Sequence, residues 1–282
     1  MDFLPPFSWD THVHVFDPIK YPYIPNTRYN PPARSVQDLV TSTPTKNFII
    51  VMSGPEGTDT AQTIDAIEQL ERDGRNAKGV VVMDIEKMTI DNLQRLNDAG
   101  VRSVRFNTRR DEITTLDSSF EEAVRRIHTA GVKWSVEAAI FDVALWYRLG
   151  PTLRKLHGKY GTIFIADHVF AAQPSQLEST EFKSLLDLVE DGMVVVKISG
   201  LTRYGRDAVT MMPVVKEVLK RRNGTGCVWG SDWPHVNSSP GATNLMEVDI
   251  LEHLRLLKCV CDKLGNGTWE KVMRDNAVSV YI

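Results

Sequence analysis

Short apolar runs alternate with amphipathic stretches along almost the whole chain. An opening strand is expected at 8–15, and later apolar runs rich in β-branched residues predict buried strands. Between them lie segments with helical spacing, such as Ile64, Ile67 and Leu70, which Gly74 follows as a stop signal. The later strands are expected at 47–53, 78–84, 101–107, 132–138, 162–168, 193–199 and 226–232.

This alternation predicts the fold class. Strands separated by helices imply parallel pairing with right-handed crossovers, and eight such units in 282 residues suit a closed barrel. An open doubly wound sheet is the alternative, but 14–18 lacks the Gly-x-Gly-x-x-Gly turn that would favour it. We therefore predict an α/β fold, a (β/α)8 TIM barrel, as a single domain over 1–282. Helices are expected at 35–41, 58–73, 89–99, 117–130, 141–160 (with a break near Gly150-Pro151), 180–191, 207–222, 245–264 and 268–280.

Composition narrows the class of partner. The chain is 42% hydrophobic and 24% charged, with a formal net charge of −3, which gives no electrostatic support to a nucleic-acid or membrane partner. No apolar run approaches the roughly 20 residues that span a bilayer. The three cysteines fit a reducing compartment, and the N-terminus has no secretory signal pattern. A cytoplasmic protein with a small-molecule substrate is expected, and a homo-oligomer is left open.

Polar residues gather where the predicted strands end. His12 and His14 alternate with apolar residues, so Asp10, His12 and His14 are expected on one strand face and Trp9, Thr11, Val13 and Val15 on the other. The carboxyl ends of barrel strands meet at one mouth, where active sites lie. The polar residues at these ends are His12, His14, Arg105, Asn107, Glu137, His168, Lys197, Ser199 and Asp232.

Each of these residues also has a purely structural interpretation. Arg105 lies on the surface if its strand is read out of register, Glu137 can be solvated in the next helical turn, and Lys197 can extend out to solvent. The Pro- and Tyr-rich segment 17–34, which includes Tyr29, is expected to be a long loop that either covers the site or is only structural.

Several motifs together resemble the amidohydrolase superfamily, in the branch of pyrone dicarboxylate lactonase and sugar lactonases. They are Asp-x-His-x-His at 10–14, the isolated His168, and Gly-Ser-Asp-Trp-Pro at 230–234. The resemblance extends over the whole chain through Ser-Val-Gln-Asp-Leu at 35–39, Val-Arg-Ser-Val-Arg-Phe-Asn at 101–107 and Lys-Ile-Ser-Gly at 197–200.

The resemblance implies roles for individual residues. Asp232 would be the general base for water, and His12, His14 and His168 would polarise a carbonyl. They would act either directly or through one divalent metal ion such as zinc, held by these histidines and Asp232. Arg105, Arg109 or Arg110, and Arg203 match the arginines that hold substrate carboxylates in the family, and guanidinium groups suit that task. Tyr29, Glu137 and Lys197 are further candidates for substrate binding.

Two departures from the superfamily pattern bear on the metal. Arg105 and Glu137 stand where a bridging carboxylated lysine would be sought, so a binuclear site is not expected. Lys197 and Ser199 stand where a second strand-borne histidine is common. Three hypotheses follow: a hydrolase that opens a lactone or related cyclic ester of a carboxylated molecule, a non-oxidative decarboxylase of an aromatic or muconate-type acid on the same site, or a ligand-binding barrel without turnover.

Overall fold

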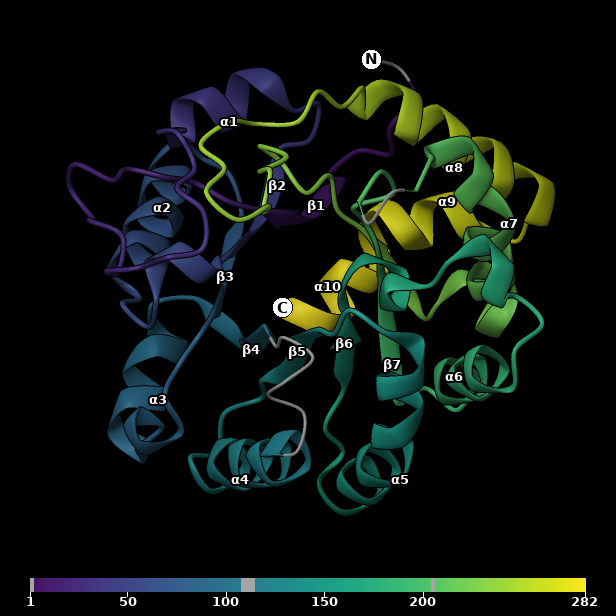
Figure 1. Cartoon of the computed structure of the whole chain (residues 1–282), viewed down its shortest axis with the longest axis horizontal. Helices are drawn as coiled ribbons and strands as arrows, with labels where there is room; N and C mark the ends of the chain where they lie inside the picture. The colour runs from purple at the N-terminus through teal and green to yellow at the C-terminus, as the bar shows by residue number, and fades with distance from the viewer. Residues whose placement is uncertain (1–2, 108–114, 204–205) are drawn as a thin grey trace.

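A computed structural model describes residues 3–107, 115–203 and 206–282. These residues form an eight-stranded parallel sheet in which each strand pairs with the next one in the chain. Figure 1 shows the strands as a ring surrounded by helices, so the predicted TIM barrel is confirmed. The strands are β1 (Trp9–Val13), β2 (Asn47–Val51), β3 (Ala77–Val81), β4 (Val101–Asn107), β5 (Ser135–Ala139), β6 (Phe164–Ala166), β7 (Val194–Ile198) and β8 (Cys227–Trp229).

The helices pack their apolar faces on the outside of the sheet. Many begin at a capping side chain, such as Ser35 before α1 and Asp207 before α7, which accept hydrogen bonds from backbone N–H groups of the first turn. None in the described part of the chain is long and apolar enough to cross a membrane. The helices are α1 (Val36–Ser42), α2 (Ala61–Arg72), α3 (Ile90–Asp98), α4 (Leu116–Thr129), α5 (Val143–Tyr160), α6 (Thr180–Glu190), α7 (Ala208–Lys220), α8 (Ile250–Leu264), α9 (Thr268–Glu270) and α10 (Asn276–Tyr281).

The expected break in the helix at Gly150-Pro151 is wrong. Helix α5 runs unbroken through Pro151. A proline inside a helix removes one hydrogen bond and costs about 3 kcal/mol. Trp146, Leu149 and Leu153 on the same helix are at most 2% exposed, and this burial offsets the local cost.

The seam between the first and last strands closes the ring and positions the candidate site. The backbone N–H of His14 donates to Trp233 O at 2.8 Å, and the N–H of Asp232 donates to His12 O, also at 2.8 Å. Residues more than 200 positions apart in the chain are therefore joined by backbone bonds. This pairing places both strand histidines next to Asp232.

Apolar side chains fill the lower part of the barrel. Trp9 packs in one buried cluster with residues of β2, β3, β6, β7 and β8, and Tyr281 of the last helix joins it. Figure 1 shows α10 near the centre of the ring. The C-terminal helix thus plugs the barrel, and the polar side chains lie above this apolar layer.

Strand β1 departs from strict alternation. Trp9 packs inside the barrel, whereas Val13 packs with Val36 and Phe48 outside it, although the two are four residues apart. The pairing with β2 shifts register between Asp10 and Val13. Such an irregularity moves the side chains that follow it to the opposite face of the sheet. The expectation that Trp9 and Val13 share a face is wrong for this reason.

Candidate active site

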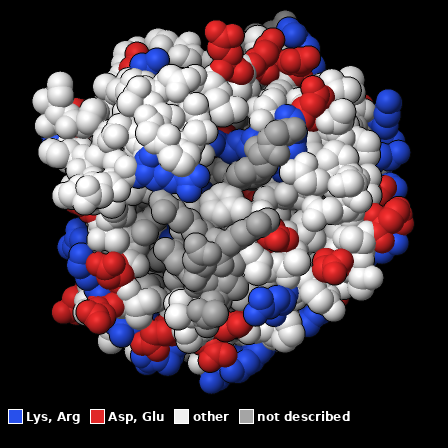
Figure 2. Space-filling view, viewed as in Figure 1, with Lys and Arg blue, Asp and Glu red and all other residues white. Residues whose placement is uncertain are grey.

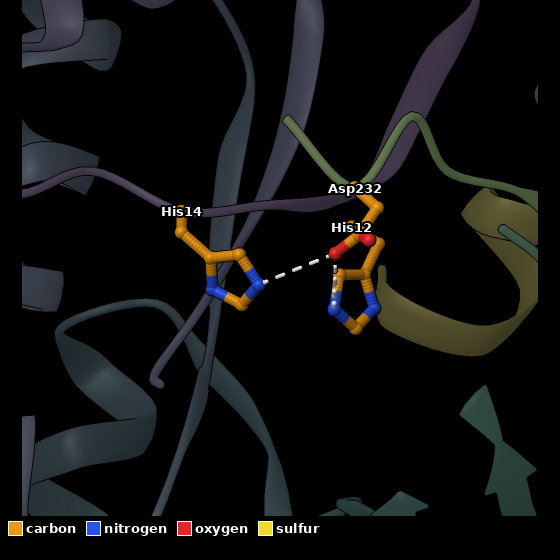
Figure 3. Close-up of side chains that lie close together, drawn as sticks. All are labelled: His12, His14 and Asp232. Atoms are coloured by element: carbon orange, nitrogen blue, oxygen red, sulfur yellow. Dashed lines mark ion pairs between the residues drawn. The ribbon is translucent and has the colours of Figure 1, made fainter. Parts of the chain in front are cut away.

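Two histidines of the first strand segment and an aspartate after the last strand converge. Nε2 of His12 lies 3.8 Å and Nε2 of His14 lies 3.7 Å from the same oxygen, Oδ1 of Asp232. Figure 3 shows the carboxylate reaching toward the two imidazole rings. All three side chains are buried, at most 7% exposed. The structure therefore brings together three of the four residues expected at the mouth, and the fourth, His168, has its ring centre 4.8 Å from that of His12.

This cluster has the donor set of a metal site. Nε2 of His12 and Oδ1 of Asp232 are buried and have no hydrogen-bond partner among the described residues. The ligand atoms of His12, His14 and Asp232 lie within 4.8 Å of one another and could hold a metal ion, as could those of His12, Asp167 and His168. Burial lowers the pKa values of His12 and His14, so both imidazoles are neutral at pH 7, as a metal ligand must be.

The position of the proton on the neutral His14 ring follows from the contact of Nδ1. Nδ1 lies 2.6 Å from the carbonyl oxygen of Val51. Because a carbonyl oxygen only accepts hydrogen bonds, Nδ1 carries the proton, and Nε2 of the neutral ring presents a lone pair. That lone pair faces an oxygen of Asp232, which also has only lone pairs to offer when ionised. Two acceptors facing each other are stabilised by a cation between them.

The backbone around Asp232 is shaped to bring it close to the first strand. Asp232 has φ +65°, a conformation in which a non-glycine residue is uncommon. Gly230 lies two residues before Asp232, and a Cβ atom at this position would lie 2.5 Å from Cβ of His12. Nε of Arg203 donates a short hydrogen bond to Oδ2 of Asp232. Burial alone would raise the pKa of Asp232, but the charge of Arg203 holds it well below its usual range, so the carboxylate is ionised.

His168 sits on an unusual backbone turn. It begins a run of four non-glycine residues with φ between +51° and +58°, which ends at Ala171. Left-handed conformations cost roughly 1–2 kcal/mol per residue, so surrounding contacts must hold them. Arg206 does so: its guanidinium donates to the carbonyls of His168, Ala172 and Gly200 at 3.1, 3.2 and 2.6 Å. Nδ1 of His168 lies 2.9 Å from Oγ of Ser199, and burial lowers the pKa of His168 to about 3.

Below the histidines lies a buried network of four charged side chains from neighbouring strands. Arg105 donates two hydrogen bonds to Oδ2 of Asp167, from Nε at 2.9 Å and from Nη2 at 2.7 Å. Nζ of Lys197 lies 2.6 Å from Oε2 of Glu137. Glu137 and Lys197 are fully buried and Arg105 is 4% exposed. Arg105, Glu137 and Lys197 were expected to bind substrate. The structure pairs each of them with an opposite charge of the protein, and their contact with a substrate stays a prediction.

Tyr29 reaches the mouth from the long loop after β1. This loop is fastened to the segment after β8, where Asn30 N–H donates to Ala242 O at 2.9 Å and Gly241 N–H donates to Arg28 O at 2.8 Å. The hydroxyl of Tyr29 lies beside Gly54 and within the electrostatic influence of Arg105 and Arg203. Figure 2 shows Lys and Arg atoms close to a depression in the middle of this face. Arg109 and Arg110 lie outside the described residues.

Sequence reasoning missed three residues of this region. Asp167 lies in the strand expected at 162–168 and was not identified as a site residue, although an Asp-His pair at a strand end is a signal of its own. Arg206 donates hydrogen bonds to backbone carbonyls, and such contacts leave no sequence pattern. Glu56 accepts hydrogen bonds from Ser53 and Gln62, and burial raises its pKa to about 7. The Ser-x-x-Glu spacing of Ser53 and Glu56 is a capping signal that could have located it.

The barrel and its mouth define a TIM-barrel enzyme with a histidine and aspartate centre. The chain belongs to the amidohydrolase family, whose model matches residues 9–281. Two relatives are similar to most of it. One is 4-sulfomuconolactone hydrolase of Hydrogenophaga intermedia, 29% identical over 82% of this chain and 76% of the relative. The other is 2-pyrone-4,6-dicarboxylate hydrolase of Comamonas testosteroni, 28% identical over 83% of this chain and 79% of the relative.

Solved structures share the fold. A structure described as a probable 2-pyrone-4,6-dicarboxylic acid hydrolase from Acinetobacter baumannii, with citric acid bound, superposes with a TM-score of 0.77 at 20% identity. It covers 98% of this chain and 99% of its own. An amidohydrolase from Burkholderia multivorans with bound zinc has a TM-score of 0.68 at 16% identity, with coverage of 98% and 99%. At these identities the likeness is one of fold.

Proposed function

We propose that this enzyme hydrolyses a lactone or related cyclic ester that carries a carboxylate or similar acidic group. The observation that carries this proposal is the ionised Asp232, paired with Arg203 on one oxygen and facing two neutral histidines with the other. Such an arrangement suits the removal of a proton from water next to a polarised carbonyl. The names of both relatives, a sulfomuconolactone hydrolase and a pyrone dicarboxylate hydrolase, support the same class of substrate.

Asp232 would act as the general base. Its Oδ1 takes a proton from water as the water oxygen attacks the lactone carbonyl carbon. The ring C–O bond then breaks, and the proton passes to the departing ring oxygen, so that one water is consumed and one hydroxy acid is formed. Arg203 keeps the carboxylate ionised and oriented before the attack.

His12, His14 and Asp232 fit a single divalent ion, with His168 beside them, and zinc suits a site of nitrogen and oxygen ligands. Such an ion would supply a Lewis acid for the carbonyl oxygen and would lower the pKa of a bound water. Independently of it, the chain orients the histidine rings, excludes bulk water by burial and holds the acceptor for the proton.

The substrate's acidic groups would bind near Arg203, Tyr29 and Arg109. Arg203 lies at the mouth with its guanidinium already directed to Asp232, and Tyr29 supplies a hydroxyl from the covering loop. Guanidinium groups bind planar carboxylates through paired hydrogen bonds. Because the chain as a whole is negatively charged, these local cations would account for the attraction of an anionic small molecule.

The decarboxylase hypothesis has less support from the site. Decarboxylation of a ring requires a proton donor for the ring carbon. Among the described mouth residues, Asp232 is held ionised and the histidine pKa values are lowered, so these groups are poor acids at neutral pH. Lactone hydrolysis needs a proton acceptor instead, and the ionised carboxylate of Asp232 is such an acceptor, although its pairing with Arg203 lowers its basicity.

The test uses 2-pyrone-4,6-dicarboxylate and 4-sulfomuconolactone in water labelled with oxygen-18. Hydrolysis places one labelled oxygen in the product carboxylate, whereas decarboxylation releases carbon dioxide. Asp232→Asn should abolish turnover and leave the fold intact. Asp262→Asn, an exposed change in an i,i+4 ion pair, is the matched control and should leave turnover unchanged. Undiminished turnover in Asp232→Asn would exclude its role, and tight binding of either compound without turnover would favour a binding barrel.

A further inference from the structure

The ring of His12 has a second nitrogen, which faces down into the barrel. Nδ1 lies 3.3 Å from Oδ1 of Asp167 and 3.3 Å from Nζ of Lys197. An ionised carboxylate only accepts hydrogen bonds and an ammonium group only donates them. The two neighbours therefore favour opposite tautomers of the neutral ring. With Asp167 as partner, Nδ1 carries the proton and Nε2 presents a lone pair to the mouth; with Lys197 as partner, Nε2 carries the proton.

Asp167 and Lys197 compete for Nδ1 of His12, and each of them is bound by another charged residue of the network. Arg105 binds Oδ2 of Asp167 with two hydrogen bonds and leaves Oδ1, which has no other hydrogen-bond partner among the described residues, 3.3 Å from Nδ1 of His12. Nζ of Lys197 lies further from this oxygen, at 3.7 Å. Glu137 binds the ammonium group of Lys197 at 2.6 Å, a shorter distance than the 3.3 Å between Lys197 and His12. The stronger partner of Lys197 is thus Glu137.

We propose that Glu137 is a positioning residue that draws the donor hydrogens of Lys197 to itself, so that Nδ1 of His12 keeps its proton and donates it to Asp167, and Nε2 keeps its lone pair for the mouth. Arg105 contributes to the same arrangement, because it orients the carboxylate of Asp167 that accepts the hydrogen bond from His12. A carboxylate behind a ligating histidine fixes the tautomer and increases the basicity of the ligand nitrogen. The consequence for metal binding rests on the proposed function, whereas the tautomer itself does not.

In this proposal Glu137 and Lys197 determine the tautomer of His12 and do not contact the substrate. Both side chains are fully buried, and Oε2 of Glu137 also lies 3.4 Å from the hydroxyl of Tyr281, which belongs to the plug below the site. Nζ of Lys197 lies 3.3 Å and Oε1 of Glu137 lies 4.0 Å from Nδ1 of His12, on the side of the ring away from the mouth. Their substitution should therefore affect the histidine before it affects the binding of a substrate.

The tautomer can be read directly by nitrogen-15 NMR of metal-free protein labelled at histidine. The chain has seven histidines, and the His12 signals are those lost in His12→Gln. In the unsubstituted protein we expect protonated Nδ1 and unprotonated Nε2. Glu137→Gln should release Lys197 to donate to Nδ1 and so reverse the tautomer. Lys197→Met should keep the original tautomer, and the double variant Glu137→Gln/Lys197→Met should restore it.

Metal affinity supplies a second readout. Zinc binding measured by competition with a chelator should weaken about 10–100-fold in Glu137→Gln, the usual effect of losing an outer partner of a ligand, and should recover in the double variant. Loss of a buried pair partner can also prevent folding. Should Glu137→Gln fail to fold, Asp167→Asn tests the same point. Arg105 would bind the remaining oxygen, so that the NH2 group of the amide faces Nδ1 of His12, which should also reverse the tautomer.

Three results would overturn the proposal: a proton on Nε2 of His12 in the unsubstituted protein, an unchanged tautomer in the folded Glu137→Gln or Asp167→Asn variant, or a reversed tautomer in Lys197→Met. A rise in KM in both Glu137→Gln and Lys197→Met that persists in the double variant would also contradict the proposal, because it would indicate that these residues contact the substrate. Absence of lactone hydrolysis would refute the proposed function and leave the tautomer result standing.

Discussion

The close approach of Gly230 to His12 predicts that a single methyl group at this position damages both stability and the site. A Cβ in Gly230→Ala would lie 2.5 Å from Cβ and 2.9 Å from N of His12. The two segments would have to separate by about 0.9 Å to reach an ordinary contact of 3.4 Å. Overpacking of this kind costs about 1–3 kcal/mol, and we expect the upper end because the obstacle includes backbone.

The same displacement moves His12 relative to Asp232 across the seam. A misplacement of about 1 Å at a reacting group can reduce the rate about 100-fold. We expect a fall of that size in kcat on the lactone substrate, and a Tm lowered by roughly 2–4 °C for each kcal/mol lost. Gly158→Ala is the matched control, because nothing lies within 4 Å of its Cβ and it sits inside helix α5. It should stabilise the protein by about 0.5–1 kcal/mol. Equal activity and stability in the two variants would refute the reasoning.

Three further predictions concern stability. Burial holds the pKa of Asp10 at about 7, above the ordinary 3.8, so its ionisation opposes folding increasingly as the pH rises from about 4 to 7. Asp10→Asn should remove about 3 kcal/mol of this pH dependence between pH 5 and pH 8, measured by urea unfolding at the two values. Phe120 lies between Phe106 and Phe164 at ring distances of 4.9 and 5.9 Å, and Phe120→Ala should cost about 3–5 kcal/mol by the same assay. Zinc at 100 times its Kd should stabilise the protein by about 2.7 kcal/mol in thermal unfolding, and this gain should disappear in His14→Ala.

The fold could be predicted because its signal is local. A buried parallel strand needs a continuous apolar run, and each predicted run contains or overlaps an observed strand. The irregularity in β1 could not be predicted in this way, because the chain between Asp10 and Val13 carries no glycine or proline to mark it. It follows from pairing with β2 and from closure onto the segment after β8, which are properties of the assembled barrel.

The site was predictable at the level of which residues lie near the strand ends. Their partners were not, because Arg105 and Asp167 are 62 positions apart and only the register of neighbouring strands brings them together. The sequence shows an arginine and a lysine near a mouth, and an anionic substrate is the natural interpretation. The structure shows that buried carboxylates bind both cations.

The contact between His14 and Val51 bears on how the histidines could act on a carbonyl. To polarise a lactone carbonyl without a metal, an imidazole must donate an N–H to the carbonyl oxygen. His14 uses its one proton on the carbonyl of Val51, so its Nε2 could donate only as imidazolium. Burial lowers the pKa of His14 and opposes that form. Chelation should therefore reduce turnover, and addition of zinc should restore it. Full activity in protein shown by elemental analysis to be free of metal would mean that His14 acts as imidazolium against the effect of burial, or that another histidine of the mouth donates to the carbonyl oxygen.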